Sequence, residues 1–197
     1  MKLLFIISMF VMLLGISVFG QNQAKKSAVC TEETARKISS RGINIGANVK
    51  DVINLFALTE AEKQRLLRSS SGSDNDRIGY KFFSISPDPN PQPPNENLVG
   101  ISDYTFSFLD KGLTGFTIFY NKPVWENTEQ FTVKMAETFA LPDIKSWNSE
   151  PDGTLWLQCG NYKITTQTFN FGRSSIGIYD NRIRQILEQR KRKAANE

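Results

Sequence analysis

The chain of 197 residues contains no histidine. Histidine is the usual general base near neutral pH and the commonest zinc ligand, so Ser-His and Cys-His nucleophile pairs are excluded. Two cysteines alone cannot build a structural zinc site. The phosphate-binding patterns GxxxxGK(S/T) and GxGxxG and the EF-hand calcium loop are also missing. We therefore expect no metal ion, no cofactor and no enzymatic activity.

An acid-pair hydrolase is the enzyme class that these absences leave open, because glycosidases need only two carboxylates across a cleft. The candidate carboxylates are Asp103, Asp110, Glu126 and Glu129. Each also suits an ordinary place in a fold, since Asp110 lies in a turn sequence and Glu129 in the first turn of an expected helix.

A long apolar run occurs only at the beginning of the chain, from residue 3 to residue 19. It follows Lys2 and ends at Gly20, where small or modest side chains suit cleavage, as in a secretory signal peptide over residues 1–20. An uncleaved membrane anchor is the alternative, since about 20 apolar residues can span a bilayer. The polar residues that begin at Gln21 favour cleavage. We expect a secreted or periplasmic protein with no integral membrane span after cleavage.

Both cysteines, Cys30 and Cys159, lie beyond the expected signal. In an oxidising compartment an even pair predicts one disulfide, and two buried free thiols are the alternative. Closing a loop of more than 100 residues would stabilise the fold by roughly 4–5 kcal/mol on loop-entropy grounds. No Asn-x-Ser/Thr glycosylation site occurs, which favours bacterial export over eukaryotic secretion.

Positive charge is concentrated at the end of the chain. Residues 182–197 hold six Lys/Arg and two Asp/Glu, whereas the rest is close to neutral. The cluster Arg190, Lys191, Arg192 and Lys193 predicts binding to an anionic surface such as lipid, cell-wall polymer or nucleic acid. The alternative is structural, because cations at a helix C-terminus complement the helix dipole.

Helical patterns come first after the signal. Residues 31–40 predict a short helix, and Asn48 can cap a second helix with one apolar face, formed by Val49, Val52, Ile53 and Phe56. Thr59 and Glu62 form a capping-box pattern that opens a third helix to about residue 68. The polar stretch 69–76 and the proline-rich stretch 86–95 are expected loops, the latter with a polyproline ligand as the alternative.

Strand patterns follow in two groups of three. Residues 80–85 predict a strand, and alternation at 104–108 and 116–120 predicts a hairpin around Asp110-Lys111-Gly112, with Gly112 available for a positive φ. A helix over 127–140 precedes strands at 155–159, 162–171 and 175–179. A basic amphipathic helix over 180–197 ends the chain, with apolar contacts at Ile183, Ile186 and Leu187.

The expected fold class is α+β: an antiparallel sheet of about six strands with helices on one face. Residues 21–197 would form a single domain, with two tandem helix-plus-three-strand units at about 42–121 and 125–180 as a further hypothesis. A doubly wound parallel sheet would need a helix between each pair of strands, and the sequence has none there.

The stretch from Gly42 to Val52, followed later by a hairpin, resembles small envelope lipoproteins of the SmpA/OmlA type. Tandem helix-plus-meander units are similar to the fold of the β-lactamase inhibitory proteins. The hairpin and the second half also resemble uncharacterised exported bacterial proteins. These resemblances imply a protein-binding or envelope-assembly role, although the chain lacks the cysteine to which such lipoproteins attach their lipid.

Aromatic residues gather in and around the expected strands, where most would form the core. Trp125, Trp147 and Trp156 are the candidates for a partner-binding strip, and Trp156 alternates with Leu155 and Leu157 on its strand. The core is the alternative place for each. The leading hypothesis is a non-enzymatic interaction domain whose partner is another protein.

Overall fold

A computed structural model describes residues 29–56, 58–69, 77–86 and 100–196. The expected signal peptide, the loop at 70–76 and almost all of the proline-rich stretch lie outside these residues. The helices are α2 (Glu32–Arg36), α3 (Val49–Asn54), α4 (Glu60–Ser69), α6 (Thr128–Thr138) and α7 (Arg182–Ala195). The strands are β1 (Tyr80–Ile85), β2 (Ile101–Leu109), β3 (Gly112–Tyr120), β4 (Asn148–Ser149), β5 (Leu155–Cys159), β6 (Tyr162–Thr168) and β7 (Ser174–Asp180).

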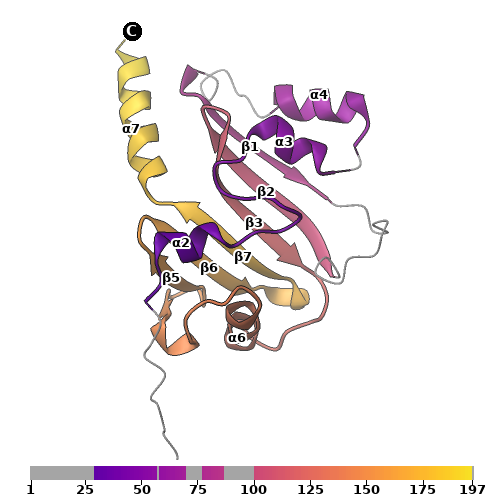
Figure 1. Cartoon of the computed structure of the whole chain (residues 1–197), viewed down its shortest axis with the longest axis vertical. Coiled ribbons are helices and arrows are strands. Elements are labelled where there is room, and N and C mark those ends of the chain that lie inside the picture. The colour runs from indigo at the N-terminus through magenta and orange to yellow at the C-terminus, as the bar shows by residue number, and fades with distance from the viewer. Residues whose placement is uncertain (1–28, 57, 70–76, 87–99, 197) are drawn as a thin grey trace, which may run out of the picture.

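The strands form one antiparallel sheet in the order β1-β2-β3-β7-β6-β5-β4 (Figure 1). The α+β class is therefore confirmed, with seven strands instead of about six. The additional strand, β4, has two residues and pairs with the beginning of β5. Two residues cannot show an alternating pattern, which is why the sequence gives no sign of this strand.

The strand order is mirrored about the centre of the sheet. The meander β1-β2-β3 and the meander β5-β6-β7 each end at the middle, where β3 pairs with β7 from Gly115–Tyr179 to Tyr120–Ser174. This arrangement is what two tandem units would produce if their last strands met side by side. A duplication of the two halves stays a prediction.

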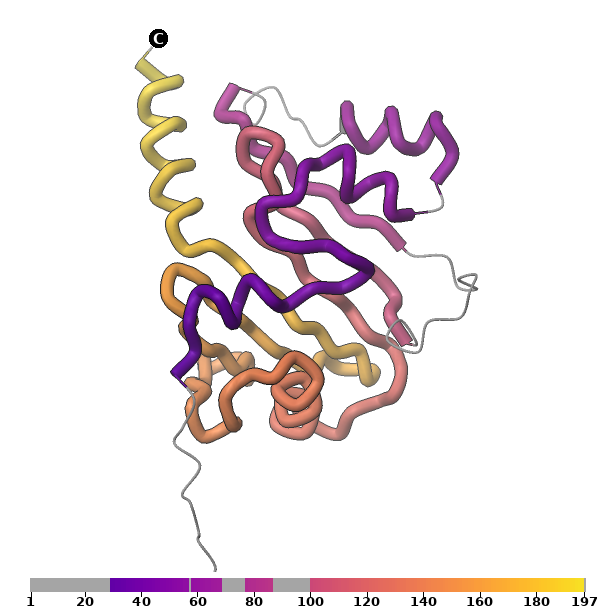
Figure 2. Tube along the Cα trace, in the orientation of Figure 1, coloured from indigo at the N-terminus to yellow at the C-terminus, as the bar shows by residue number. Residues whose placement is uncertain are grey.

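One face of the sheet, here called the inner face, carries α2, α3 and α6 (Figure 1). Figure 2 shows the segment between α2 and α3 crossing in front of the central strands. A row of buried side chains crosses six strands in register beneath these helices: Phe83, Phe106, Phe116, Ile178, Ile164 and Leu157. The core therefore lies between the inner face and the helices.

The helix-start signals in the sequence are confirmed. The side chain of Asn48 accepts a hydrogen bond from the Lys50 amide at 3.0 Å, and that of Asn127 accepts one from the Gln130 amide at 2.9 Å. Thr59 and Glu62 make the reciprocal bonds of a capping box. Helix α2 is shorter than expected, because it ends at residue 36 instead of residue 40.

Two expectations about turns were wrong. At the β2–β3 hairpin the positive φ angles belong to Asp110 and Lys111, not to Gly112. The two-residue loop of such a hairpin places both central residues in the left-handed region, and Gly112 already lies in β3. The expected strand over 162–171 ends at residue 168, because Phe171 and Gly172 adopt positive φ angles in the turn before β7.

Cys30 and Cys159 form a disulfide, as predicted, with their Cα atoms 4.6 Å apart. Cys159 is fully buried at the end of β5, and Cys30 lies two residues before the start of α2. The bond therefore ties the first described residues to the inner face of the sheet.

Candidate binding surface on the outer face of the sheet

The other face of the sheet, here called the outer face, is formed by the residues that alternate with the buried row. One register row on this face is Phe82, Ser107, Gly115, Tyr179, Lys163 and Gln158. The next row is Ser84, Thr105, Thr117, Gly177, Thr165 and Trp156. The middle of the outer face thus consists of hydroxyl groups, glycines and aromatic rings.

Aromatic side chains on this side of the sheet, and one in the turn before β7, are unusually exposed. Phe82 is 51% exposed, and Tyr179 and Phe169 are each 39% exposed. Phe171 is fully exposed at the turn between β6 and β7, with φ 71°. A left-handed backbone is unfavourable for a bulky side chain, and solvent exposure of the ring adds no folding energy. Core formation therefore does not explain these rings.

A shallow hollow of about 310 Å³ lies between the exposed rings, and we call it the sheet hollow. Its walls include Phe82, Phe119, Phe169 and Tyr179, and its polar lining includes Thr105, Ser107, Thr117, Thr165, Gln167 and Ser175. Such a mixture of apolar rims and short hydroxyl side chains can bury apolar groups of a ligand and hydrogen-bond its backbone.

Two glycines allow Tyr179 to lie flat on the sheet. A Cβ atom at Gly177 would lie 2.7 Å from the Tyr179 ring, and one at Gly115 would lie 2.9 Å from it. The Tyr179 hydroxyl also forms a hydrogen bond with Thr117 on the neighbouring strand. The ring is therefore held in position by contacts within the sheet itself.

One end of the sheet hollow is held by Arg173. Its guanidinium pairs with Asp103 at 2.8 Å and lies 4.2 Å from the centre of the Phe119 ring. Phe119 in turn packs near Phe169, with ring centres 6.5 Å apart. These contacts fix the rim of the hollow and occupy the carboxylate of Asp103.

The three tryptophans are distributed between the core and the outer face. Trp125 packs edge-on against Phe131, and Trp147 donates a 3.1 Å hydrogen bond to the Pro142 carbonyl; both are partly buried against the core. Trp156 lies on the outer face, beneath the Lys163 ammonium at 4.8 Å. The structure therefore does not bring the three together.

Sequence reasoning missed Phe82, Phe169 and Tyr179 as surface candidates. In Phe82-Phe83 the two positions of a strand are both aromatic, so alternation alone does not say which one faces the helices. The signal that could have found Tyr179 is the pattern Gly177-x-Tyr179, since glycine in a strand often marks the close approach of another group.

A second hollow of about 330 Å³ lies between α7 and the outer face, and we call it the helix groove. Tyr80, Ser107 and Tyr179 contribute the sheet side, and Ile183, Arg184, Leu187 and Lys191 are among its lining residues on α7. The two hollows adjoin, because Ser107 and Tyr179 line both.

The four cations predicted to bind an anionic surface have different environments. Arg190 makes two bonds of 2.7 and 2.6 Å to Asp110 and donates to the Ile78 carbonyl at 2.9 Å. Hydrogen bonding from Arg190 lowers the pKa of Asp110 below its usual value. Among the described residues, Lys191, Arg192 and Lys193 make no ion pair.

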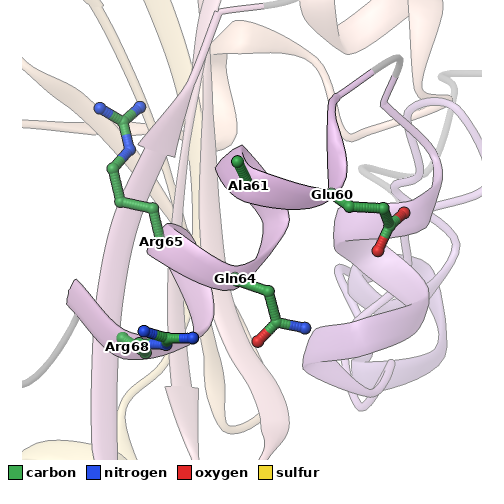
Figure 3. A pocket seen from close by; sticks show the side chains of 5 residues that line it. All are labelled: Glu60, Ala61, Gln64, Arg65 and Arg68. Carbon is green, nitrogen blue, oxygen red and sulfur yellow. The ribbon is translucent and has the colours of Figure 1, made fainter.

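The candidate carboxylates do not meet in one cleft. Asp110 lies in the β2–β3 turn and Asp103 near the opposite end of β2, while Glu126 and Glu129 lie at the start of α6. The described residues contain no group of three or more metal-binding side chains. A further hollow is lined by Glu60, Ala61, Gln64, Arg65 and Arg68, but Figure 3 shows that all five belong to α4. It is therefore the surface of one helix.

No helix in the described part of the chain has the length and apolar character needed to cross a membrane. Neither a family model, nor a curated protein, nor a solved structure matches the chain.

Proposed function

We propose that the chain is an exported, non-enzymatic interaction domain that binds a partner protein through the outer face of its sheet. The observation that carries this proposal is the group of exposed aromatic rings, Phe82, Phe169 and Tyr179, around the sheet hollow. Contiguous exposed apolar surface in a water-soluble domain marks an interaction site, and aromatic residues dominate the binding energy of protein interfaces.

A protein fits this surface better than a glycan does. Sugars stack on the free faces of aromatic rings, but cations cover two of the rings here. Arg173 lies over Phe119 and Lys163 lies over Trp156. The free apolar surface belongs instead to Phe82 and to the rim of a hollow, which suits the side chains of a polypeptide.

Export is the second part of the proposal. A disulfide between Cys30 and Cys159 is stable in an oxidising compartment and rare in the cytosol. The amino-terminal sequence has the layout of a cleavable signal. Both features support a secreted or periplasmic place, in agreement with the envelope role that the SmpA/OmlA resemblance implies.

Site-specific cross-linking tests the partner-binding surface. We would place the photo-reactive residue p-benzoylphenylalanine at Phe82 and, as a matched control, at Val133, an exposed apolar position of α6 on the other side of the molecule. We expect a protein adduct at residue 82 and none at residue 133. Excess unlabelled wild type should compete for the adduct, whereas a Phe82→Asp, Tyr179→Asp variant should not.

The outcomes of this experiment are distinct. Adducts at both positions, or at neither, would contradict a partner site on the outer face. An adduct at residue 82 that resists protease but is removed by glycosidases would replace the protein partner with a glycan. Thermal unfolding of each labelled protein verifies that the label leaves the fold intact.

Binding to an anionic surface is the second candidate function. Lys191, Arg192 and Lys193 support it, because they are exposed at the end of α7. Each cation near an anionic membrane contributes about 1 kcal/mol. Truncation after Gln189 should abolish sedimentation with phosphatidylglycerol vesicles at low salt. Sedimentation that is unchanged by the truncation would remove this candidate.

A further inference from the structure

The side of α7 that is turned toward the sheet is apolar, and the rest of the domain covers it only in part. Ile183, Ile186 and Leu187 are half-buried, and no residue of α7 is fully buried. Across the helix groove, Ile183 and Leu187 lie opposite Tyr80 and Tyr179. A volume of about 330 Å³ separates the two sides.

The helix is held in this position at its far end. The Arg190 guanidinium binds both the Asp110 carboxylate and the Ile78 carbonyl, which lie at the β2–β3 turn and just before β1. Arg77 donates a 3.1 Å hydrogen bond to the carbonyl of Ala194 in the last turn of α7. These bonds fix one wall of the groove relative to the sheet, so the groove is already formed in the free protein.

Four charged side chains line the groove, two cations and two acids, and they differ in whether they are paired. Arg184 and Lys191 line it and make no ion pair in the described part of the chain. Of the two acids that line it, Asp180 is bound by Arg182 at 2.6 Å, which leaves Glu188 as the remaining negative charge. An acidic ligand therefore complements this surface electrostatically.

We propose that the helix groove binds an acidic, apolar-anchored peptide segment of the partner protein, an inference that rests on the proposed function. An apolar side chain of the segment lies between Tyr179 and the Ile183–Leu187 side of α7. Aspartate or glutamate side chains on either side of it pair with Arg184 and Lys191. Because Ser107 and Tyr179 line both hollows, the segment continues into the sheet hollow.

The volume of the groove agrees with this occupant. At about 330 Å³ it lies at the small end of ligand sites, which range over roughly 300–1,000 Å³. It can take one or two side chains of a peptide. Both proposals use Lys191, but only this one uses Arg184, whereas membrane binding would also use Arg192 and Lys193, so those three side chains distinguish the two.

The test is a selection of random dodecapeptides displayed on phage, with the wild-type protein beginning at Gln21 as bait. We expect the selected peptides to be enriched in Asp and Glu next to Leu, Ile or Phe. Synthetic copies should bind an Arg184→Glu, Lys191→Glu variant at least about tenfold more weakly than wild type, a loss of roughly 1.4 kcal/mol. A matched Arg192→Glu, Lys193→Glu variant makes the same charge change outside the groove and should lose less than about threefold.

Equal losses in the two double variants would overturn the proposal, because they would indicate diffuse attraction to the whole tail. Selected peptides that are neutral or basic, or a selection without binders, would overturn it too. Binding of phosphatidylglycerol vesicles that depends on Arg184 and Lys191, but not on Arg192 and Lys193, would assign the groove to lipid instead. An Arg184→Gln, Lys191→Gln variant covers the case in which the glutamates disturb α7.

The proposed function is tested separately. If the peptide experiment contradicts the groove assignment while residue 82 still forms the specific cross-link, the outer face binds a partner and only the groove assignment is wrong. If the cross-link also fails, the proposed function is wrong as well.

Discussion

The two faces of the sheet use the same strands and similar residue types for different purposes. Phe83 and Phe82 are neighbours in β1, yet Phe83 is 5% exposed and Phe82 is 51% exposed. Phe83 packs against the rings of Phe106 and Phe108 on the inner face. Phe82 points to the outer face, where it lines a hollow. Folding requires the first ring and provides no reason for the second.

Thr132 and Thr166, two buried hydroxyl residues on the inner face, are satisfied within the protein. The Thr132 hydroxyl donates to the Thr128 carbonyl at 2.7 Å and lies 2.6 Å from the Thr166 hydroxyl on β6. These two hydroxyl groups thus need no partner from outside the domain. The outer face exposes apolar rings to water, a cost that the proposed partner would remove on binding.

The largest expected effect is the difference between these neighbouring phenylalanines. Phe83→Ala should lower the free energy of unfolding by about 3–5 kcal/mol, because it leaves a cavity among buried rings. Phe82→Ala should change it by less than about 0.5 kcal/mol, as expected for a surface position. Urea unfolding followed by circular dichroism measures both. Similar losses in the two variants would show that Phe82 is part of the core and would remove the basis of the proposed surface.

The second prediction concerns the disulfide, which lies on the inner side of the sheet together with the buried core. A Cys30→Ser, Cys159→Ser variant should lose about 2–5 kcal/mol of unfolding free energy, because the unfolded chain gains the entropy of a loop of 129 residues. The same measurement on reduced wild type should give a similar loss. A loss in the variant without one in the reduced protein would assign the effect to the serine hydroxyl at buried position 159.

Local signals in the sequence predicted most of the fold. The caps at Asn48, Thr59 and Asn127 are side-chain to backbone contacts over three residues or fewer, so a sequence window contains them completely. The same holds for alternation in β2 and β3. The disulfide was predictable because only two cysteines exist, which leaves one possible pairing.

The candidate site was much less predictable. Its parts come from strands far apart in the chain, such as Phe82 and Tyr179, and only the sheet register brings them together. Which residue of an aromatic pair faces outward depends on where the helices lie. The anchoring of Arg190 by Asp110 joins positions 80 residues apart, and a basic run such as Arg190-Lys191-Arg192-Lys193 does not reveal which cation is engaged.

The position of Tyr179 gives a prediction of intermediate size. Gly177→Ala would place a methyl group 2.7 Å from the Tyr179 ring, so the ring must move or the strands must shift. We expect a loss of about 1–3 kcal/mol in unfolding free energy. A Gly177→Ala, Tyr179→Ala variant should lose less than the sum of the two single variants, because the added methyl group then fills space left by the ring. Additive losses would contradict a ring lying over Gly177.

The smallest expected effect concerns the anchor of α7. The hydrogen bond from Arg190 lowers the pKa of Asp110. The ion pair therefore stabilises the folded protein fully above the ordinary carboxyl pKa of about 3.9, and this stabilisation is lost as the pH falls through the lowered pKa. Both side chains are partly exposed, which limits the contribution to about 0.2–1 kcal/mol. Because no residue of α7 is fully buried, loss of this anchor should free the end of the helix without unfolding the domain.

Residue-resolved NMR amide signals at pH 6 and then in steps below pH 4 measure this effect. We expect the amides near Ala194 to lose helical shifts in acid, and Asp110→Asn to show the same loss already at pH 6. Burial raises the pKa of Asp180, but the hydrogen bonds that it accepts from Arg182 lower this pKa by more, so the net shift is downward. The first turn of α7 therefore also responds to acid. The amide signals of this first turn, at Ile183, are therefore followed separately from those near Ala194. Glu188→Gln, a charge change on α7 away from the anchor, is the control and should leave Ala194 helical at pH 6. If Asp110→Asn also left it helical, Arg190 would not hold α7 in place, and the fixed wall of the helix groove would need another origin.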